Sequence, residues 1–231
     1  MATLSTLLAP ELAQPGSRWE LRRDVNGYAR ARGDGLATQA SAGRGFRVLR
    51  REDGRLQVEL LEDGYRCWLS LDDVVGRAAR RGPWSPQLLQ ANQIAQRLPA
   101  VLAWTEQAEQ QSNVYLWGGT TPPDMDCSGL IQSAFASQGI WIPRDAYQQE
   151  RFCTPVAVRP GDHRLLRPGD LLFFGTPRRC TMWAFTSAVA ATATAPDANT
   201  VETALAWTAF TPATVIRSQP TTARSCAGQV A

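Results

Sequence analysis

The chain has 231 residues, of which 44% are hydrophobic and 19% are charged, and its formal net charge is +3. These fractions are typical of a soluble globular protein, and the length allows one domain or two. The basic residues are scattered rather than gathered in a stripe, so nothing in the composition favours nucleic-acid binding.

No segment reaches the roughly 20 consecutive apolar residues that a membrane-spanning helix needs. The first residues, "MATLSTLLAPELAQPGSRW", have no basic region and too short an apolar stretch for a secretory signal. We therefore predict a cytoplasmic protein without membrane association. The five cysteines form no C-x-x-C pair and no even set, which favours free thiols over disulfides or zinc.

Residues 18–73 contain short β-like runs that are broken by Gly and Asp. In "FRVLRREDGRLQVEL", apolar residues alternate on both sides of Asp53-Gly54, which is a hairpin signal. Several short strands at this spacing predict a small barrel. The stretch "RGPWSPQLLQANQIAQRLPAVLAW" then reads as a proline-rich linker followed by helical periodicity, and it indicates a joint leading into a second domain.

The second domain contains a cysteine at the predicted start of a helix. In "DCSGLIQSAFASQG", either Asp126 or Ser128 can cap a helix that ends at Gly139. Cys127 would then lie where unpaired backbone N–H groups and the helix dipole favour the thiolate, the form that attacks. The alternative is a small buried hydrophobic residue. Further along, "LRPGDLLFFG" predicts an apolar strand after a turn.

Four motifs together carry a family resemblance. They are "YLWGG" at 115–119, "DCSGL" at 126–130, "IPRDAYQQ" at 142–149 and "RPGDLLFF" at 167–174. In this order they resemble the NlpC-type cell-wall cysteine endopeptidases, which are papain-like enzymes that cut γ-D-glutamyl bonds to a diamino acid in peptidoglycan peptides. The N-terminal region resembles the bacterial SH3-like domain that precedes the catalytic domain in one branch of that family.

The resemblance implies an α+β fold and a role for each motif residue. We expect an SH3-like barrel over 1–82 and, over 83–181, a linker helix followed by a papain-like domain with a helix against an antiparallel sheet. Cys127 would be the nucleophile. Tyr115 and backbone N–H groups near Cys127 would stabilise the oxyanion of the tetrahedral intermediate.

The resemblance also implies a substrate pocket. Its lining for the peptide's free amino end would be Asp126, Ser128, Arg144 and Asp145, with Tyr65 closing it from the SH3-like domain. On residue chemistry alone, Arg144 and Asp145 could equally form an ordinary surface ion pair, and Tyr65 could belong to the barrel core. No cofactor and no metal is implied.

The general base of such an enzyme is missing from the sequence. The family places a histidine just after the "GDLLFF" strand and a second polar group about a dozen residues later, but this chain has no histidine after His163. His163 itself lies in a polar loop before that strand, and we interpret it as a solvated residue rather than a substitute base.

The genetic code suggests why the base is missing. Met182-Trp183-Ala184 must be encoded AUG UGG GCN, and reading one nucleotide earlier forces Val-Gly after a codon that can specify His. The same shift permits His-Ser-Ser-Gly in register with 194–197. Of the last 50 residues, 14 are Ala and 10 are Thr, and periodicity is hard to find there. We interpret 182–231 as a frameshifted segment, from a sequencing error or a real lesion; the alternative is a low-complexity tail.

The predicted function is hydrolysis of the bond between γ-D-glutamate and meso-diaminopimelate, or a similar diamino acid, in cell-wall turnover or recycling. The partner would be a peptidoglycan-derived peptide with a free N-terminal L-Ala. The literal chain, meaning the 231 residues with 182–231 as they stand in the sequence, is expected to be inactive and to lack the sheet strands after residue 181. Two alternatives are a non-catalytic binder of wall peptides and an acyl transferase or amidase on the same scaffold.

Overall fold

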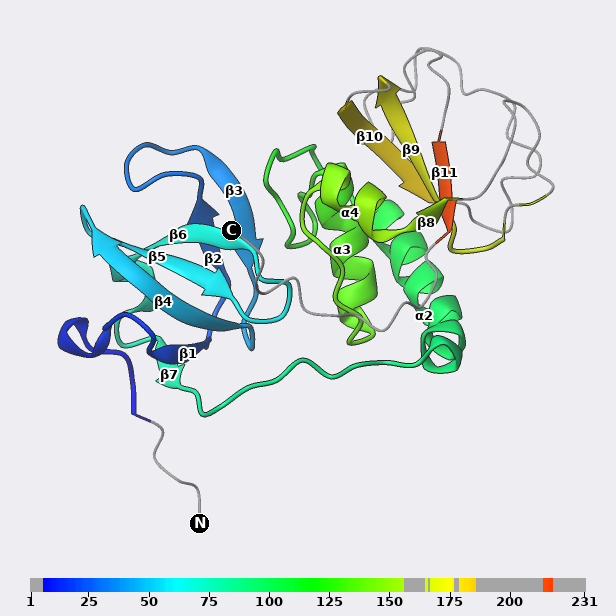
Figure 1. Cartoon of the computed structure of the whole chain (residues 1–231). Coiled ribbons are helices and arrows are strands. Elements are labelled where there is room, and N and C mark those ends of the chain that lie inside the picture. The colour runs from blue at the N-terminus through cyan, green and yellow to red at the C-terminus, as the bar shows by residue number, and fades with distance from the viewer. Residues whose placement is uncertain (1–5, 156–164, 166, 177–178, 186–213, 218–231) are drawn as a thin grey trace. The chain divides into compact units, whose positions relative to one another are not determined.

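The structure is a computed structural model, and it describes residues 6–155, 165, 167–176, 179–185 and 214–217. From residue 172 onward, Phe173 is the position whose side chain is described. The described residues divide into two compact units (Figure 1). The first unit contains 6–88 and Trp117–Thr121, and the second contains Leu89–Leu116 and the described residues from Pro122 onward.

The first unit is an antiparallel sheet of seven strands. Its spatial order is β3-β2-β6-β5-β4-β1-β7, and the sheet curls on itself in the manner of a small barrel (Figure 1). The strands are β1 (Arg18–Leu21), β2 (Val25–Tyr28), β3 (Leu36–Ala40), β4 (Gly45–Glu52), β5 (Arg55–Leu60), β6 (Arg66–Ser70) and β7 (Ala78–Arg80). Two short helical segments, η1 (Pro10–Leu12) and α1 (Leu71–Val74), complete the unit.

The predicted hairpin over Asp53-Gly54 is confirmed. Strands β4 and β5 pair antiparallel with Glu52 opposite Arg55, which leaves a two-residue turn. Asp53 and Gly54 have φ angles of 50° and 75°. Positive φ at both central residues is the requirement of the turn whose twist matches that of the flanking strands.

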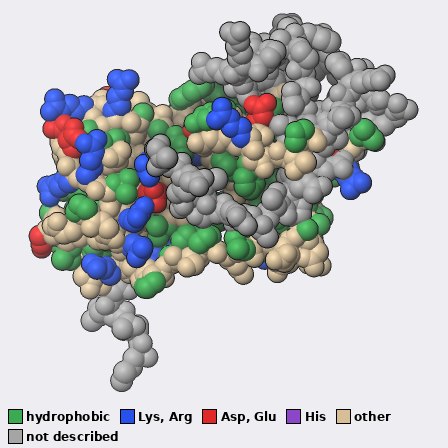
Figure 2. Space-filling view, in the orientation of Figure 1, with side chains coloured by type: hydrophobic (Ala, Val, Ile, Leu, Met, Phe, Trp, Pro, Cys, Tyr) green, Lys and Arg blue, Asp and Glu red, His purple; other side chains and the backbone are tan. Residues whose placement is uncertain are grey.

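The core of the first unit follows from the alternation of its strands. On β5 every second residue is buried, because successive side chains point to opposite faces of the sheet. The fully buried members include Trp19, Leu21, Phe46, Val48, Leu56, Val58, Leu60, Leu69 and Val74. Charged side chains of both signs are spread over the visible surface of this unit (Figure 2), and all 24 Lys and Arg residues of the chain are arginines.

The second unit places helices beside a small antiparallel sheet, so the described chain is α+β. The helices are α2 (Ala91–Glu109), α3 (Cys127–Ser137) and α4 (Ala146–Phe152). The sheet has the order β10-β9-β11-β8, with β8 (Thr154–Pro155), β9 (Leu171–Thr176), β10 (Arg179–Phe185) and β11 (Thr214–Arg217). None of the helices in the described part of the chain has the length and hydropathy of a membrane span.

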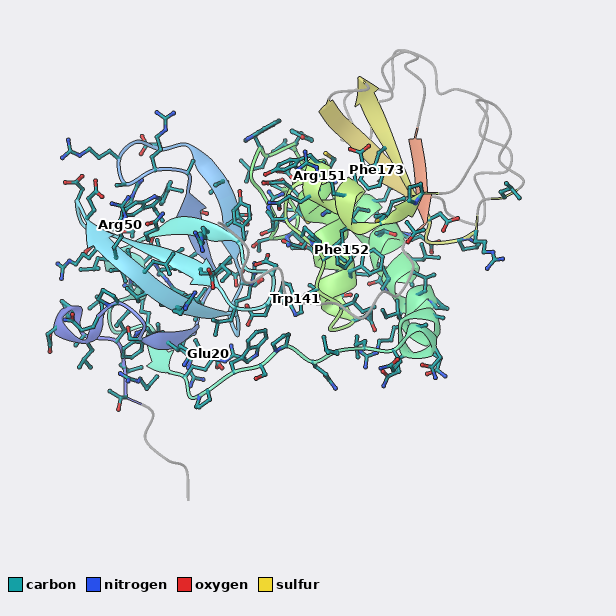
Figure 3. The ribbon with its side chains drawn as sticks, in the orientation of Figure 1. Glu20, Arg50, Trp141, Arg151, Phe152 and Phe173 are labelled. Carbon is teal, nitrogen blue, oxygen red and sulfur yellow. The ribbon has the colours of Figure 1, made fainter. Side chains whose placement is uncertain are left out.

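A second hydrophobic core joins α3 to the sheet. Ile131 and Phe135 of α3 are buried together with Leu171 and Phe173 of β9, and Val101 of α2 lies in the same cluster. Figure 3 labels Phe173 and Phe152, which come to this core from β9 and α4. The apolar strand predicted after the Pro-Gly-Asp turn is β9, and it lies between β10 and β11.

The expectation that sheet strands are missing after residue 181 is wrong for two described segments. Strand β10 continues to Phe185, with Trp183 opposite Phe173 beyond a register irregularity between Cys180 and Met182. Strand β11 pairs with the other edge of β9. Ladder hydrogen bonds are made by the backbone, and Thr, Trp and Phe are residues that strands favour. A change of reading frame therefore need not end a strand. The other residues of 182–231 lie outside the described residues.

Candidate active site

The start of helix α3 is fixed by the side chain of Asp126. Its backbone is extended, and its Oδ1 accepts the backbone N–H of Gly129 at 2.7 Å. Of the two capping residues that the sequence allowed, the structure therefore selects Asp126. Cys127 becomes the first residue of the helix, where backbone N–H groups lack partners within the helix and the helix dipole is positive.

A buried ion pair holds this cap in place. Arg144 is 2% exposed, and its two terminal nitrogens donate to the two carboxylate oxygens of Asp126 at 3.1 and 2.7 Å. The same guanidinium donates to Ser128 Oγ at 2.8 Å, and that hydroxyl donates to Asp126 Oδ1 at 3.1 Å. Two-point contact and shared hydrogen bonds offset the large cost of removing both charges from water.

The network corrects one alternative that the sequence left open. Arg144 does not form a surface ion pair with Asp145, because it is buried and its ion-pair partner is Asp126. Asp126, Ser128 and Arg144 were predicted to line one pocket, and in the structure they lie together in one cluster. Their hydrogen bonds join them to one another and to the helix start. Contact with a substrate stays a prediction.

Tyr115 lies beside the thiol of Cys127. Its hydroxyl donates to Cys127 Sγ at 3.9 Å, and both side chains reach solvent, since Tyr115 is 49% exposed and Cys127 is partly exposed. Partial burial raises the pKa of Tyr115 well above its usual range, and negative charge on Cys127 raises it further. The phenol therefore keeps its proton and acts as a hydrogen-bond donor toward the sulfur.

Two backbone contacts keep Tyr115 near the helix start. The N–H of Val114 donates to Asp124 Oδ1 at 2.9 Å, and the N–H of Leu116 donates to the carbonyl of Met125 at 3.3 Å. The residues on either side of Tyr115 are therefore tied to the two residues before Asp126. The sequence signals that indicated Cys127 and Tyr115 separately thus converge in one place.

Two buried glutamines were missed by the sequence analysis. Gln149 of α4 donates to the carbonyls of Pro143 and Ser128 at 2.7 and 3.2 Å, and Gln132 of α3 donates to the carbonyl of Ile142 at 2.9 Å. Both tie a helix to the segment that carries Arg144. The available signal was the position of Gln132 among the apolar residues of α3; nothing local distinguishes Gln149 from its neighbour Gln148.

The remaining predicted site residues lie elsewhere. Asp145 is partly exposed at the N-cap position of α4. Tyr65 belongs to the first unit, is partly buried and packs against its hydrophobic core, which supports the barrel-core alternative. Its role in closing a pocket stays a prediction. His163 lies outside the described residues. Within the described ranges, no three metal-ligating side chains come together.

Each unit contains a segment that matches a known family. Residues 112–185 match the NlpC/P60 family, and residues 27–74 match the bacterial dipeptidyl-peptidase SH3 domain. The chain carries an NlpC/P60 domain and a bacterial SH3 domain. The NlpC/P60 match contains Tyr115, Cys127 and the Arg144 network, and it ends at the last residue of β10. The SH3 match contains Tyr65.

Curated relatives of the NlpC/P60 domain are peptidases. The gamma-D-glutamyl-L-lysine dipeptidyl-peptidase of Bacillus cereus is 31% identical over 118 residues, which are 50% of this chain and 29% of that protein. The protein of the same name from Bacillus subtilis is 45% identical over 60 residues, 26% of this chain and 19% of that protein. The bifunctional muramidase/DL-endopeptidase CwlT of Bacillus subtilis is 38% identical over 71 residues, 30% of this chain and 20% of that protein.

The chain thus aligns with less than a third of the length of each of these relatives. Among solved structures, it is similar to NlpC2 from Trichomonas vaginalis, with 17% identity and a TM-score of 0.39 over 76% of this chain and 86% of that one.

Proposed function

We propose that the NlpC/P60 domain of this chain is built for thiol hydrolysis of peptidoglycan stem peptides, at the bond between γ-D-glutamate and meso-diaminopimelate or a similar diamino acid. The observation that carries the proposal is the thiol of Cys127 at the start of α3, with the Tyr115 hydroxyl 3.9 Å from its sulfur. Two relatives are gamma-D-glutamyl-L-lysine dipeptidyl-peptidases, which supports the choice of bond.

The reaction would begin at Cys127. Its thiolate attacks the carbonyl carbon of the γ-glutamyl bond, a sulfur–carbon bond forms, and the carbonyl oxygen becomes an oxyanion. The Tyr115 hydroxyl and backbone N–H groups at the start of α3 donate to that oxygen. Collapse of the tetrahedral intermediate breaks the carbon–nitrogen bond and leaves a thioester, which water hydrolyses to restore the thiol.

Proton transfers accompany both the formation and the hydrolysis of the thioester, and they decide whether this chain can turn over. A base must take the proton of the thiol and return it to the amine that leaves. The chain has one histidine, at position 163, and none follows the strand after which the family places its base. We therefore propose that the literal 231-residue chain does not turn over, and that a chain restored to frame after residue 181 does.

The proposed pocket for the amino end of the peptide uses residues around the helix start. Asp126, Ser128 and Arg144 are held rigidly by their mutual hydrogen bonds, which suits a surface that must be preformed. Asp145 follows Arg144 directly and is partly exposed, which supports its proposed role of binding an ammonium group. Tyr65 of the SH3 domain is assigned to the same pocket from the family resemblance.

The test compares two genes. The literal chain and a version with one added nucleotide near codon 181 are incubated with L-Ala-γ-D-Glu-meso-diaminopimelate and with the L-Lys analogue, and the products are identified by mass spectrometry. We expect cleavage by the restored chain alone, and loss of that cleavage in its Cys127→Ala variant. Cleavage by the literal chain would refute the proposed inactivity, and failure of the restored chain on both peptides would refute the substrate class.

A second candidate function is supported by the missing histidine. Without a base, the chain could hold the same peptide without cutting it. Calorimetry of the literal chain with the tripeptide would then show binding that weakens in an Arg144→Met variant, with no product formed. An acyl transferase on the same scaffold would instead give an amide product when the restored chain is supplied with an amine acceptor.

A further inference from the structure

The segment Trp117–Thr121 lies between Tyr115 and Cys127 in the sequence, yet it is folded as part of the first unit. Its main anchor is Gln39 on strand β3. The side-chain Oε1 of Gln39 accepts the backbone N–H groups of both Thr120 and Thr121 at 3.1 Å. The carbonyl of Gln39 accepts the hydroxyl of Thr120 at 2.7 Å.

The side chain of Gln39 is itself held in the orientation that these bonds require. Its Nε2 donates to Asn26 Oδ1 on the neighbouring strand β2 at 3.2 Å, so Oε1 is turned toward the segment. Strand β3 is an edge of the sheet, where backbone groups are open to a further partner. Thr120 is 6% exposed, which shields these bonds from competition with water.

Gly118 shows how closely the segment lies against β3. Its φ angle is +85°, and a Cβ placed there would lie 2.8 Å from the backbone oxygen of Leu36. Both the backbone conformation and the available space therefore require glycine at this position. The segment is thus bound to β3 by several hydrogen bonds and by close backbone packing.

The two ends of the segment lead directly to the reactive thiol. One end continues from Leu116, whose N–H is bonded to Met125, and the residue before it is Tyr115. The other end leads through Asp124 to the capping residue Asp126 and to Cys127. The hydroxyl-to-sulfur contact of 3.9 Å is already long, so a small displacement of Tyr115 would remove it.

We propose that Gln39 is a positioning residue for the pair formed by Tyr115 and Cys127. By holding Thr120 and Thr121 against β3, it limits the conformations of the chain between these two residues and keeps the Tyr115 hydroxyl directed at the sulfur. The inference rests on the proposed function only in taking Cys127 as the reactive thiol. Its test measures thiol reactivity rather than hydrolysis, so it does not depend on whether the chain cuts peptides.

The experiment measures alkylation of each cysteine by iodoacetamide in the full chain, followed by peptide mapping, at about pH 7 and about pH 9.5. The ratio of the two rates at Cys127 reports how strongly the thiolate is stabilised, because accessibility cancels in the ratio. Tyr115→Phe should lower this ratio about five-fold and Gln39→Ala about three-fold. Thr120→Val, which removes the hydroxyl bonded to the Gln39 carbonyl, should lower it by a smaller factor.

Two further variants make the effect specific. Gln39→Glu keeps an oxygen that can accept the N–H groups of Thr120 and Thr121, and it should retain a ratio close to that of the wild type. Gln57→Ala is the matched control, since Gln57 lies on β5 of the same sheet and its side chain accepts from Arg50 instead. It should leave the ratio unchanged.

The double variant decides whether Gln39 acts through Tyr115. Gln39→Ala should cause no further loss in the Tyr115→Phe background, because residues that act as one unit are not additive. An additional three-fold loss there, or an unchanged ratio in the single Gln39→Ala variant, would overturn the proposal. Simple unfolding is recognised separately, because it would speed the labelling of Cys127 and of the partly buried Cys153 together.

Discussion

Cys67 and Cys127 each lie next to a buried arginine–carboxylate cluster, but the two thiols have different surroundings. Cys67 is 2% exposed, and burial raises its pKa from 9.0 to about 12 although the Arg44 charge lowers it. Cys127 is partly exposed, is the first residue of α3, and accepts a hydrogen bond from the Tyr115 hydroxyl. A nearby guanidinium is therefore not enough to keep the pKa of a thiol from rising when that thiol is buried.

The two arginines differ in what their clusters hold in place. Arg44 is 5% exposed and contacts the consecutive acids Glu62 and Asp63, at 3.5 and 2.8 Å. It thereby fixes a turn of the SH3 domain. Arg144 makes a two-point contact with Asp126, the residue that caps α3. This buried ion pair therefore holds the start of the helix, where Cys127 lies. The first cluster stabilises a turn, and the second holds the helix start that carries Cys127, the proposed nucleophile.

The largest expected effect is at Arg144. Arg144→Met would leave the carboxylate of Asp126 buried without its partner, and we expect the second unit to lose about 4 kcal/mol of unfolding free energy. Urea denaturation with a probe in the second unit measures it. Arg151→Met, at an exposed arginine of the same unit, is the matched control and should change stability by less than about 0.5 kcal/mol. Equal effects of the two substitutions would break the comparison.

Arg44→Met should destabilise the first unit somewhat less, by about 3 kcal/mol, because Arg81 still contacts Glu62 at 3.3 Å. The same denaturation experiment applies, with a probe in the first unit. If this cluster is only architectural, the alkylation rate of Cys127 stays at its wild-type value in the folded variant. A selective change at Cys127 would contradict the distinction drawn between the two clusters.

The buried thiol of Cys67 should make stability depend on alkaline pH. Its pKa is higher in the folded chain than in the unfolded one, so the unfolded chain releases the proton first and stability falls as pH rises above 9.0 toward about 12. At about pH 10.5 the loss would be about 2 kcal/mol. Cys67→Ala should remove this loss of stability when the free energy of unfolding is measured at pH 9.0 and at about pH 10.5. An identical slope in the variant would show that Cys67 is not responsible.

The smallest expected effect is at Ser128. Ser128→Ala removes one hydrogen bond from Arg144 and one to Asp126 but leaves the two-point ion pair intact. We expect a loss of about 1 kcal/mol in the unfolding free energy of the second unit. Ser137→Ala, which removes a hydroxyl bonded within the same helix, provides the reference. A loss as large as that of Arg144→Met would mean that the hydroxyl, not the ion pair, holds the helix start.

Features with local signals could be predicted from the sequence. The Asp53-Gly54 hairpin depends on two turn residues, the start of α3 on a capping residue, and β9 on a short apolar run. The partners of long-range bonds could not be predicted in this way. Arg144 pairs with a residue 18 positions away rather than with adjacent Asp145, and Gln39 binds a residue 81 positions away. Such contacts depend on how whole helices and strands pack together, and local sequence patterns carry no information about that packing.

The protonated phenol at Tyr115 has a consequence for the kind of reagent that this site can capture. A group that keeps its proton throughout the physiological range can polarise an electrophile but cannot carry a proton from one reactant to another. In a chain without a base, as we propose here, an amide would stall, because its nitrogen must leave as an amine. A chloroacetamide releases chloride, which needs no proton, and the enolate formed from a Michael acceptor takes its proton from water. Covalent probes of these classes should therefore trap Cys127 even in a chain that never releases a product.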